Sequence, residues 1–354
     1  MYNSLACVNS FTSHGKRPLF NILPAVKQRQ ARLQAEFDCS PHLPNRLGTL
    51  AQLAVRVGVI QNSLKPCLHR PTLMICAADH GAFSNRVHSV PAEDTRQQLQ
   101  HTLAGTAPIN RLASANGLEL LLVDAGVSEA LPETPHLHDA RIAAGTANYV
   151  RQPAMSREQC LQALYNGTVL VDSLSQQGCN IVGFGTIGAG NSGSAALLMS
   201  ALCYLPIERC IGHGDGGDAV SAYFNIRTLQ YARQRLSTSQ ATRDPVQLLS
   251  EFGGFEIVTV CGCMLRAAER GMVIVVDGFA STAALLAARA LNANVVDYCI
   301  ASHRSAEPGH SLMLQQLRAR PLLELELQAS GGIGVALAYP LINSAVALLS
   351  DVTH

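Results

Sequence analysis

The sequence predicts an α/β protein with a Rossmann-like parallel sheet covered by helices and a small helical domain from both chain ends. Three observations carry the sheet prediction. Short apolar runs alternate with helical segments along the middle of the chain. The runs are apolar throughout, which is typical of parallel strands buried on both faces. Each run is followed by Gly, Asp, His or Ser, at the sheet edge where such proteins bind ligands.

The strand-like runs and the helices between them follow a regular order. Strands are predicted at 72–77, 118–123, 181–182, 207–211, 272–276 and 295–301. Between them, helices are predicted at 94–116, 156–177 and 282–291. Six loops at the carboxyl ends of six parallel strands would form one site.

The two ends of the chain lie outside this order and are helical in pattern. Helices are predicted there at 21–37, 47–61, 312–317, 322–327 and 335–349. We therefore expect a large α/β nucleotide-binding domain over 62–311. Residues 1–61 and 312–354 would pack together as the small helical domain.

A glycine-rich stretch at 180–194 is the most distinctive of these loops. Its glycines stand at positions 183, 185, 188, 190 and 193, ahead of an apolar segment at 195–203. This order predicts a strand, a tight turn and a helix with Ser192 or Ser194 as its N-cap. Glycines let a ligand approach closely, and the free N–H groups of a helix N-terminus bind anions, so we expect a phosphate there.

The glycine spacing alone leaves other interpretations open. Gly183-x-Gly185-x-x-Gly188 matches the dinucleotide fingerprint, and an overlapping match begins at Gly188. With Glu208, this pattern suggests a dinucleotide-dependent oxidoreductase as an alternative. A tight turn without any ligand would also need these glycines. A Walker A loop is excluded because no Lys follows the glycines in the required place.

Composition narrows the class of protein. The 354 residues are 48% hydrophobic and 14% charged, with a net charge of +1, so we expect a globular chain that binds neither nucleic acid nor membrane. The sparse charge suits an oligomer with a buried interface. The eleven cysteines have no zinc spacing, since Cys261 and Cys263 are one residue apart, and no His pair has metal spacing. We expect buried thiols, no metal, no cofactor, no membrane span and a cytoplasmic location.

Several loop motifs together resemble those of one known family. They are Ala78-Asp-His-Gly81, Gly105-Thr-Ala-Pro-Ile-Asn110, Gly188-Ala-Gly-Asn191, Asp277-Gly-Phe-Ala-Ser-Thr282 and Ser302-His-Arg-Ser-Ala-Glu-Pro-Gly-His310. The set, which spans about 44–349, is similar to that of the nicotinate-nucleotide:5,6-dimethylbenzimidazole phosphoribosyltransferase family (CobT).

The resemblance implies an activity and a set of site residues. Members of the family move the phosphoribosyl group of nicotinate mononucleotide to an aromatic acceptor, either a dimethylbenzimidazole-like base or a phenol, in the assembly of the cobamide nucleotide loop. They are dimers. By resemblance, the acceptor would lie at Ser89 and Gln97. The mononucleotide would lie at Gly188, Gly190, Asn191, Gly212, Gly278 and Ser305.

The chain also departs from the family pattern. Two positions at which the family has active-site glutamates are Thr186 and Gly331 here, and the second is regarded as the catalytic base. A family lysine falls at about Asn225, and Asp215 adds a negative charge near the expected phosphate. The resemblance therefore predicts weaker mononucleotide binding than in the family.

The missing glutamates leave two hypotheses for the activity. In the first, the chain is a phosphoribosyltransferase with another base, for which Asp79 and His213 are the candidates. In the second, it is a non-catalytic subunit that pairs with an active paralogue, so the dimer could be homo- or heterodimeric. His80, His303 and His310 could take part in catalysis, but His303 and His310 are expected to brace loops through hydrogen bonds.

Overall fold

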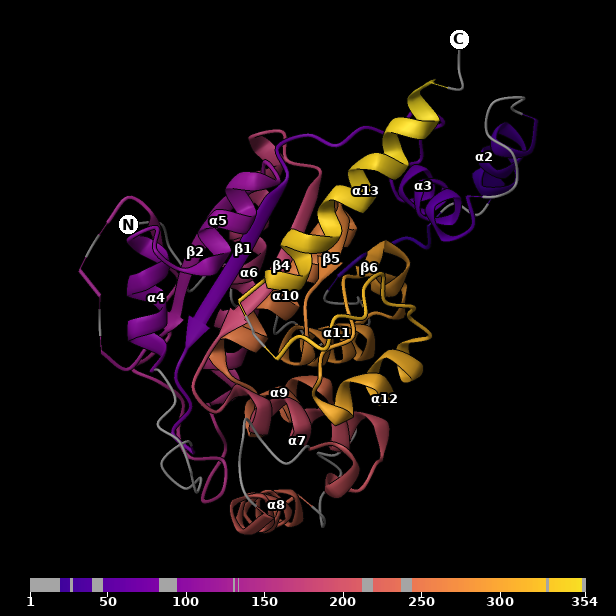
Figure 1. Ribbon diagram of the computed structural model, residues 1–354. Helices are drawn as coiled ribbons and strands as arrows, with labels where there is room; N and C mark the ends of the chain where they lie inside the picture. Colours follow the sequence, from indigo (N-terminus) through magenta and orange to yellow (C-terminus); the bar gives the residue numbers. More distant parts are fainter. Residues whose placement is uncertain are drawn as a thin grey trace.

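A single parallel sheet organises the protein. The computed structural model describes residues 20–25, 28–39, 47–82, 94–129, 131–132, 134–211, 219–236, 244–328 and 331–351. The strands are β1 (Thr72–Ala78), β2 (Glu119–Gly126), β3 (Leu137–Asp139), β4 (Ile181–Ile187), β5 (Val273–Val276) and β6 (Cys299–Ala301). They are arranged in the order β3-β2-β1-β4-β5-β6, and all pairs are parallel. The predicted fold class is confirmed (Figure 1).

The order of the strands reverses between β1 and β4, which places the topological switch point there. Every residue of both strands is buried, and Thr72 of β1 is aligned with Val182 of β4. Because both faces of these strands are covered, their sequences are apolar throughout rather than alternating. Ligands of open α/β sheets bind beyond the carboxyl ends of the strands at such a reversal.

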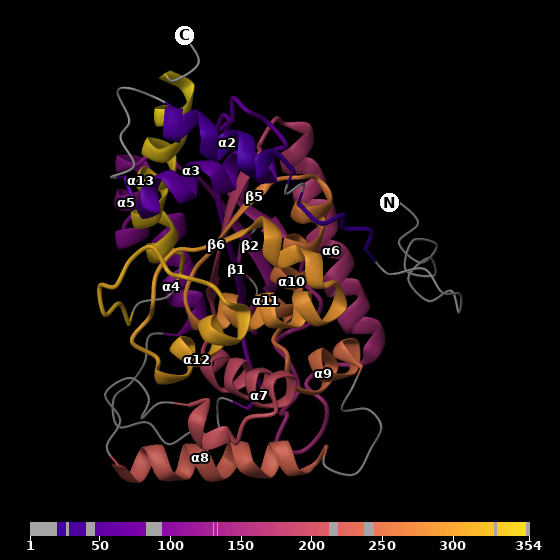
Figure 2. The same ribbon diagram turned by 90° about the vertical axis from the view of Figure 1, so that its right-hand side faces the viewer.

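Helices cover both faces of the sheet. On one face, α6 (Arg157–Gln176) packs along α10 (Phe255–Glu269), and α10 contacts β1, β2, β4 and β5. The other face carries α4 (Thr95–Leu103), α5 (Pro108–Ala115) and α13 (Ile333–Asp351). Figures 1 and 2 show the sheet between these two layers. Three further helices, α7 (Asn191–Cys203), α11 (Phe279–Leu291) and α12 (Pro308–Leu317), pack together near the carboxyl ends of the strands.

The helices near the two chain ends lie side by side. Helix α3 (Thr49–Ile60) contacts both α2 (Gln28–Cys39) and α13, as both ribbon views show. Helix α13 also packs on α5 and β4, so it belongs equally to the layer that covers the sheet. The division into two domains stays a prediction.

The structure differs from the sequence-based prediction at several elements. The run at 207–211 is not a strand, since residues 207–209 form a 3₁₀ turn, η2 (Ile207–Arg209), with Pro206 as its N-cap. The predicted helix at 94–116 is two helices, separated at Gly105, whose φ is 75°. Residues 322–327 are not helical. The edge strand β3 was not predicted, since its three residues are polar in part and not buried.

The remaining helices complete the lower part of the molecule. They are α8 (Ala219–Gln234) and α9 (Pro245–Phe252), and the short 3₁₀ helix η4 (Ala293–Tyr298) leads into β6.

Among the described residues, no helix is long and apolar enough to cross a membrane. The cysteines with described side chains are free thiols, most of them buried, and burial raises the pKa of the Cys160 thiol to about 12.

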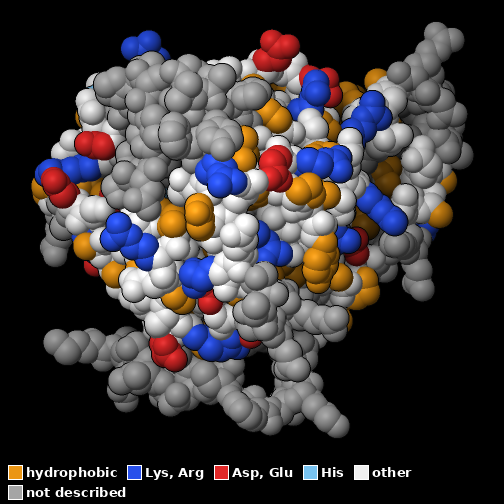
Figure 3. Space-filling view, turned by 90° about the horizontal axis from the view of Figure 1, so that it is seen from below, with side chains coloured by type: hydrophobic (Ala, Val, Ile, Leu, Met, Phe, Trp, Pro, Cys, Tyr) orange, Lys and Arg blue, Asp and Glu red, His pale blue; other side chains and the backbone are white. Residues whose placement is uncertain are grey.

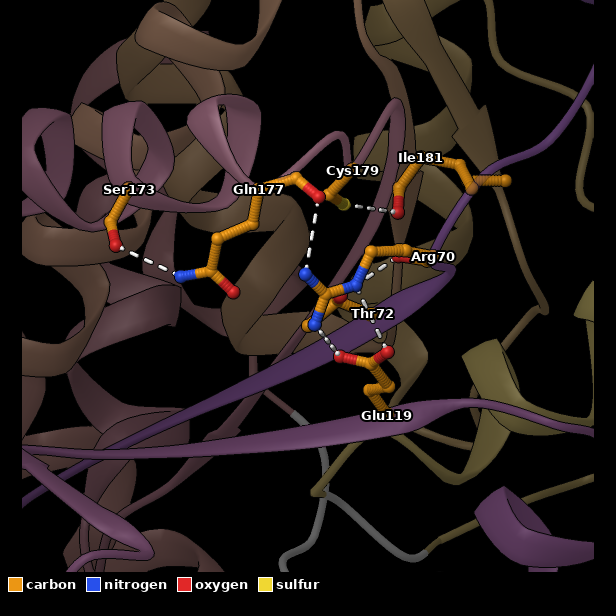
Figure 4. Close-up of polar contacts among 7 residues, drawn as sticks. All are labelled: Arg70, Thr72, Glu119, Ser173, Gln177, Cys179 and Ile181. Atoms are coloured by element: carbon orange, nitrogen blue, oxygen red, sulfur yellow. Dashed lines mark hydrogen bonds and ion pairs between the residues drawn. The ribbon is translucent and has the colours of Figure 1, made fainter.

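At the amino-terminal edge of the sheet, side chains hydrogen-bond to one another and to the backbone (Figure 4). The guanidinium of Arg70 donates to both carboxylate oxygens of Glu119, at 3.2 and 3.0 Å, and to the carbonyl oxygen of Gln177 at 3.1 Å. This ties the start of β1 to the start of β2 and to the end of α6. The two side chains are about half exposed, so the pair adds little stability.

Candidate functional site

At the carboxyl edge, the turn between β4 and α7 leads into a helix N-terminus that no side chain caps. Helix α7 begins at Asn191, its N-cap Gly190 has a φ of 94°, and no side chain caps it. The predicted serine caps are therefore wrong. The Ser192 hydroxyl donates to Glu307 at 3.1 Å, and the Ser194 hydroxyl donates to the carbonyl oxygen of Phe252. An uncapped helix N-terminus at the switch point is suited to an anion.

Gly188 is required in this turn by close packing. A Cβ on Gly188 would lie 2.6 Å from the carbonyl oxygen of Ala78 and 3.2 Å from Oε1 of Glu256. The turn is thus held against the end of β1 and the start of α10. Residue 189 is fixed from the other side, where its N–H donates to the hydroxyl of Thr95 at 2.8 Å.

A second glycine turn, at the N-terminus of α13, lies against the end of β4. The N–H of Gly331 donates to the carbonyl oxygen of Thr186 at 3.2 Å, so the two positions without glutamate are neighbours. Gly332 and Gly334 donate their N–H groups to the two carboxylate oxygens of Asp277, at 2.9 and 3.1 Å. Asp277, directly after β5, therefore caps α13 and fixes this turn over the sheet edge.

Asp277 also faces a buried histidine. Its Oδ1 lies 3.7 Å from Nδ1 of His303, which is 3.0 Å from the hydroxyl of Ser302. Burial raises the pKa of the Asp277 carboxyl, and the nearby His303 makes this increase smaller. Burial likewise lowers the pKa of His303, and Asp277 opposes that change. Nε2 of His303 is buried and has no hydrogen-bond partner in the described part of the chain.

A chain of hydrogen bonds braces the loop that carries Ser305. The N–H of Ser305 donates to Nδ1 of His310 at 2.9 Å. Nε2 of His310 lies 2.9 Å from the hydroxyl of Thr282, which donates to the carbonyl oxygen of Gly278 at 2.8 Å. His310 is therefore neutral, with its hydrogen on Nε2, and burial lowers its pKa to about 3. The predicted bracing role of His310 is confirmed.

Two aspartates lie at the same edge of the sheet. Asp79 directly follows β1, and Asp124 lies within β2. The half-buried Asp79 accepts from the N–H of Ser128 at 2.7 Å through Oδ2. Asp124 accepts from the N–H groups of residues 126 and 127 and pairs with Arg141 at 3.2 Å. Asp124 is therefore fully engaged in its loop, whereas Asp79 uses one oxygen among the contacts of the described residues.

The sequence analysis missed a buried carboxylate at this edge. Glu256, in the first turn of α10, lies with Oε1 2.7 Å from Nε2 of His80, and neither side chain is exposed. A signal was present, because Glu256 is the only charged residue between Phe255 and Leu265, in an otherwise buried stretch of helix that follows two glycines. A charge in such a stretch is costly without a partner.

The predicted site residues are not all within the described part of the chain. Gly188, Gly190 and Asn191 share the first turn, and Gly278 lies near Ser305, with 3.7 Å between its Cβ position and the Cβ of Ser305. Gln97 is exposed in the first turn of α4, and Asn225 is buried on α8. Four further predicted positions lie outside the described residues: Ser89, Gly212, His213 and Asp215.

The face around this edge carries charges of both signs. Figure 3 shows Lys and Arg side chains interspersed with Asp and Glu on the side seen from below. Among the described residues this side therefore has no broad surface of one sign, so attraction for an anionic ligand would come from local N–H groups. The described residues include no cluster of three or more His, Cys, Asp or Glu that could hold a metal ion.

Comparison with known proteins gives matches over most of the chain. A family model described as "Phosphoribosyltransferase" matches residues 22–354. Two relatives are named nicotinate-nucleotide–dimethylbenzimidazole phosphoribosyltransferase. The protein from Dechloromonas aromatica is 43% identical over 91% of this chain and 92% of its own. The protein from Cupriavidus taiwanensis is 45% identical over 90% of this chain and 91% of its own. The crystal structure of CobT from Thermus thermophilus superimposes with a TM-score of 0.86 at 34% identity, over 91% of this chain and 96% of that one.

Proposed function

Because the chain belongs to the phosphoribosyltransferase family, we propose that it transfers the phosphoribosyl group of nicotinate mononucleotide to 5,6-dimethylbenzimidazole. The observation that carries this proposal is the identity of 43% and 45%, over nine-tenths of the chain, to enzymes with that name. The uncapped N-terminus of α7 at the switch point supports it, since a phosphate is the expected ligand there. Neither of these relatives is named as a non-catalytic subunit.

The proposed reaction is a single displacement at the ribose. The lone pair of the azole nitrogen forms a bond to C1′. The bond from C1′ to nicotinate breaks, and its electron pair returns to the pyridine nitrogen. The N–H proton of the azole passes to a base, so the products are nicotinate and a neutral phosphoribosylated azole. A positioned base contributes roughly 10²–10⁴-fold to such a step.

We propose that the phosphate binds over Gly188–Asn191. The helix dipole and the N–H groups of the first turn of α7 support this placement. The ribose would then lie toward Gly278 and Ser305, whose hydroxyl oxygen is buried without a hydrogen-bond partner among the described residues. Gln97 would line the acceptor site. The dimer and the cytoplasmic location stay predictions.

The purified chain, incubated with nicotinate mononucleotide and dimethylbenzimidazole, is expected to release nicotinate and phosphoribosylated base in equal amounts. Separation of the products by chromatography measures both. Omitting the acceptor should stop nicotinate release. Nicotinate release without the coupled product, or no turnover by the folded chain, would contradict the proposal, and the second result would favour a non-catalytic subunit.

Replacing Gly331 with glutamate is expected to raise kcat by less than the full roughly 10²–10⁴-fold contribution of a base. There is room for the side chain, since the nearest atom to its Cβ would be Cγ1 of Ile187 at 3.7 Å. However, the φ of Gly331 is 78°, which costs a side chain about 1–2 kcal/mol. Gly331→Gln is the matched control because it has the same strain without a carboxylate. Equal kcat values for the two variants would show that the carboxylate contributes nothing.

A further inference from the structure

The buried pair of His80 and Glu256 lies against the turn that we propose for the phosphate. Nε2 of His80 is 2.7 Å from Oε1 of Glu256, and both side chains are completely buried. The same Oε1 lies 3.2 Å from the position of a Cβ on Gly188. The pair thus joins the carboxyl end of β1 to the N-terminus of α10 at the switch point of the sheet.

The local sequence leaves room for this pair. A Cβ on Gly254 would collide with Oε2 of Glu256 and with Cε1 of His80, and would lie 2.6 Å from Nε2. Gly254 is the N-cap of α10, so the chain enters the helix without a side chain at the position that the pair occupies. Any other residue there would displace one of the two polar groups.

Each member of the pair has a buried polar atom without a partner. Nδ1 of His80 and Oε2 of Glu256 make no hydrogen bond with the residues that the structure describes. Leaving such an atom unsatisfied costs about 1–3 kcal/mol, so a native protein that keeps two of them together calls for a functional explanation. If Glu256 is ionised, the 2.7 Å contact requires the hydrogen on Nε2, and Nδ1 then presents a free lone pair.

Two of the other acidic groups at this edge, Asp124 and Asp277, have both oxygens engaged in hydrogen bonds or ion pairs. Asp79 binds the N–H of Ser128 through one oxygen, so it is the competing base, and Asp79→Asn is the variant that compares the two. The neighbouring Thr186 and Gly331 carry no group that could act as a base at neutral pH. His80 with Glu256 has the arrangement of an imidazole that is oriented by a carboxylate, as in other general bases.

We propose that His80, oriented by Glu256, accepts the proton of the azole during the transfer. This inference rests on the proposed function. As the azole nitrogen bonds to C1′ and nicotinate leaves, the azole N–H bond breaks and its electron pair stays on the ring. The proton binds to Nδ1 of His80, and Glu256 stabilises the resulting imidazolium through Nε2–H.

Glu256→Gln and His80→Gln are each expected to lower kcat for dimethylbenzimidazole by about 10²–10³-fold. The double variant should lose no more than the single variants, because groups that act as one unit are not additive. Glu251→Gln is the matched control. Glu251 is another acidic residue with little exposure, and its carboxylate binds Arg235 and Gln247 rather than either glycine turn, so Glu251→Gln should leave kcat unchanged.

An acceptor without an N–H proton separates proton transfer from a structural role. With 1-methylbenzimidazole the product is a cation and no proton has to leave. The variants should therefore transfer to it as fast as the wild-type chain does. If the wild-type chain rejects this acceptor, 5-nitrobenzimidazole, whose N–H is more acidic, should recover much of the lost rate in the variants. Equal losses with every acceptor used would overturn the proposal.

Folding and substrate binding are checked separately. Thermal melting must show that each variant folds, and calorimetry with nicotinate mononucleotide should give the same affinity as for the wild-type chain. If Glu256→Gln does not fold, His80→Gln and Glu256→Asp carry the test. A wild-type chain that transfers to no acceptor refutes the proposed function itself. An active wild-type chain with fully active variants refutes only the role of this pair.

Discussion

Gly334→Ala is expected to lower the free energy of unfolding by about 3 kcal/mol or more, the upper part of the range for overpacked cores. A Cβ at this position would overlap the ring of His303, at Nδ1 and Cε1. The ring is completely buried and lies between Ser302 and Asp277, so it has no free space to enter. The start of α13 would have to move away from the sheet, and the Gly331 turn would move with it. Urea unfolding measures the loss, and turnover should fall in parallel.

Gly178→Ala is the reference for a Cβ added without a clash, and Gly178, unlike Gly334, has a positive φ. Gly178 has a φ of 88°, and its Cβ would meet no atom within 4 Å, so only backbone strain of about 1–2 kcal/mol is expected. A smaller loss for Gly334→Ala than for Gly178→Ala would show that His303 can move aside. The packing of α13 would then not depend on this contact.

The sheet could be predicted from the sequence because its central strands are buried on both faces. Strands β1 and β5 are short apolar runs followed by Asp, and each was predicted within one residue of its observed bounds. For β4 only the start was predicted, because Gly183 and Gly185 were expected in a turn but lie within the strand. The strand prediction at 207–211 was wrong because an apolar stretch of this length has no periodicity that separates a strand from a helical turn. Edge strand β3 was not predicted for the opposite reason, since its residues are half-exposed or exposed and show no apolar run.

The candidate site was predicted less completely because its key contacts join distant parts of the chain. The turn at Gly188 was visible in the sequence, but its contact with Glu256 is formed only when α10 packs beside β1 and β4. Asp277 was singled out at a strand end, yet its role as the cap of α13, 55 residues away, depends on tertiary structure. Local patterns locate loops, whereas the pairing of polar groups between loops needs the fold.

The wild-type chain is expected to lose stability relative to His310→Gln as the pH falls below about 6.5, the unperturbed value for histidine. Burial lowers the pKa of His310 in the folded chain to about 3. Between these two values the unfolded chain binds a proton that the folded chain does not. The free energy of unfolding therefore falls with decreasing pH, by up to about 1.4 kcal/mol per pH unit for this one group. Above pH 6.5 the contribution is complete and constant.

Urea unfolding of both chains at pH 7.5 and pH 4.5 tests this expectation. Other groups titrate in the same range, including His303, whose pKa burial also lowers. The difference between wild type and variant removes their shared contribution. It should shift by about 3 kcal/mol in favour of the variant at the lower pH. Protonation would also remove the acceptor at Nδ1 for the N–H of Ser305, so the loop beside Gly278 should loosen before the sheet unfolds. Parallel pH profiles for the two chains would mean that His310 takes up its proton without unfolding, and the loop would then not depend on the neutral ring.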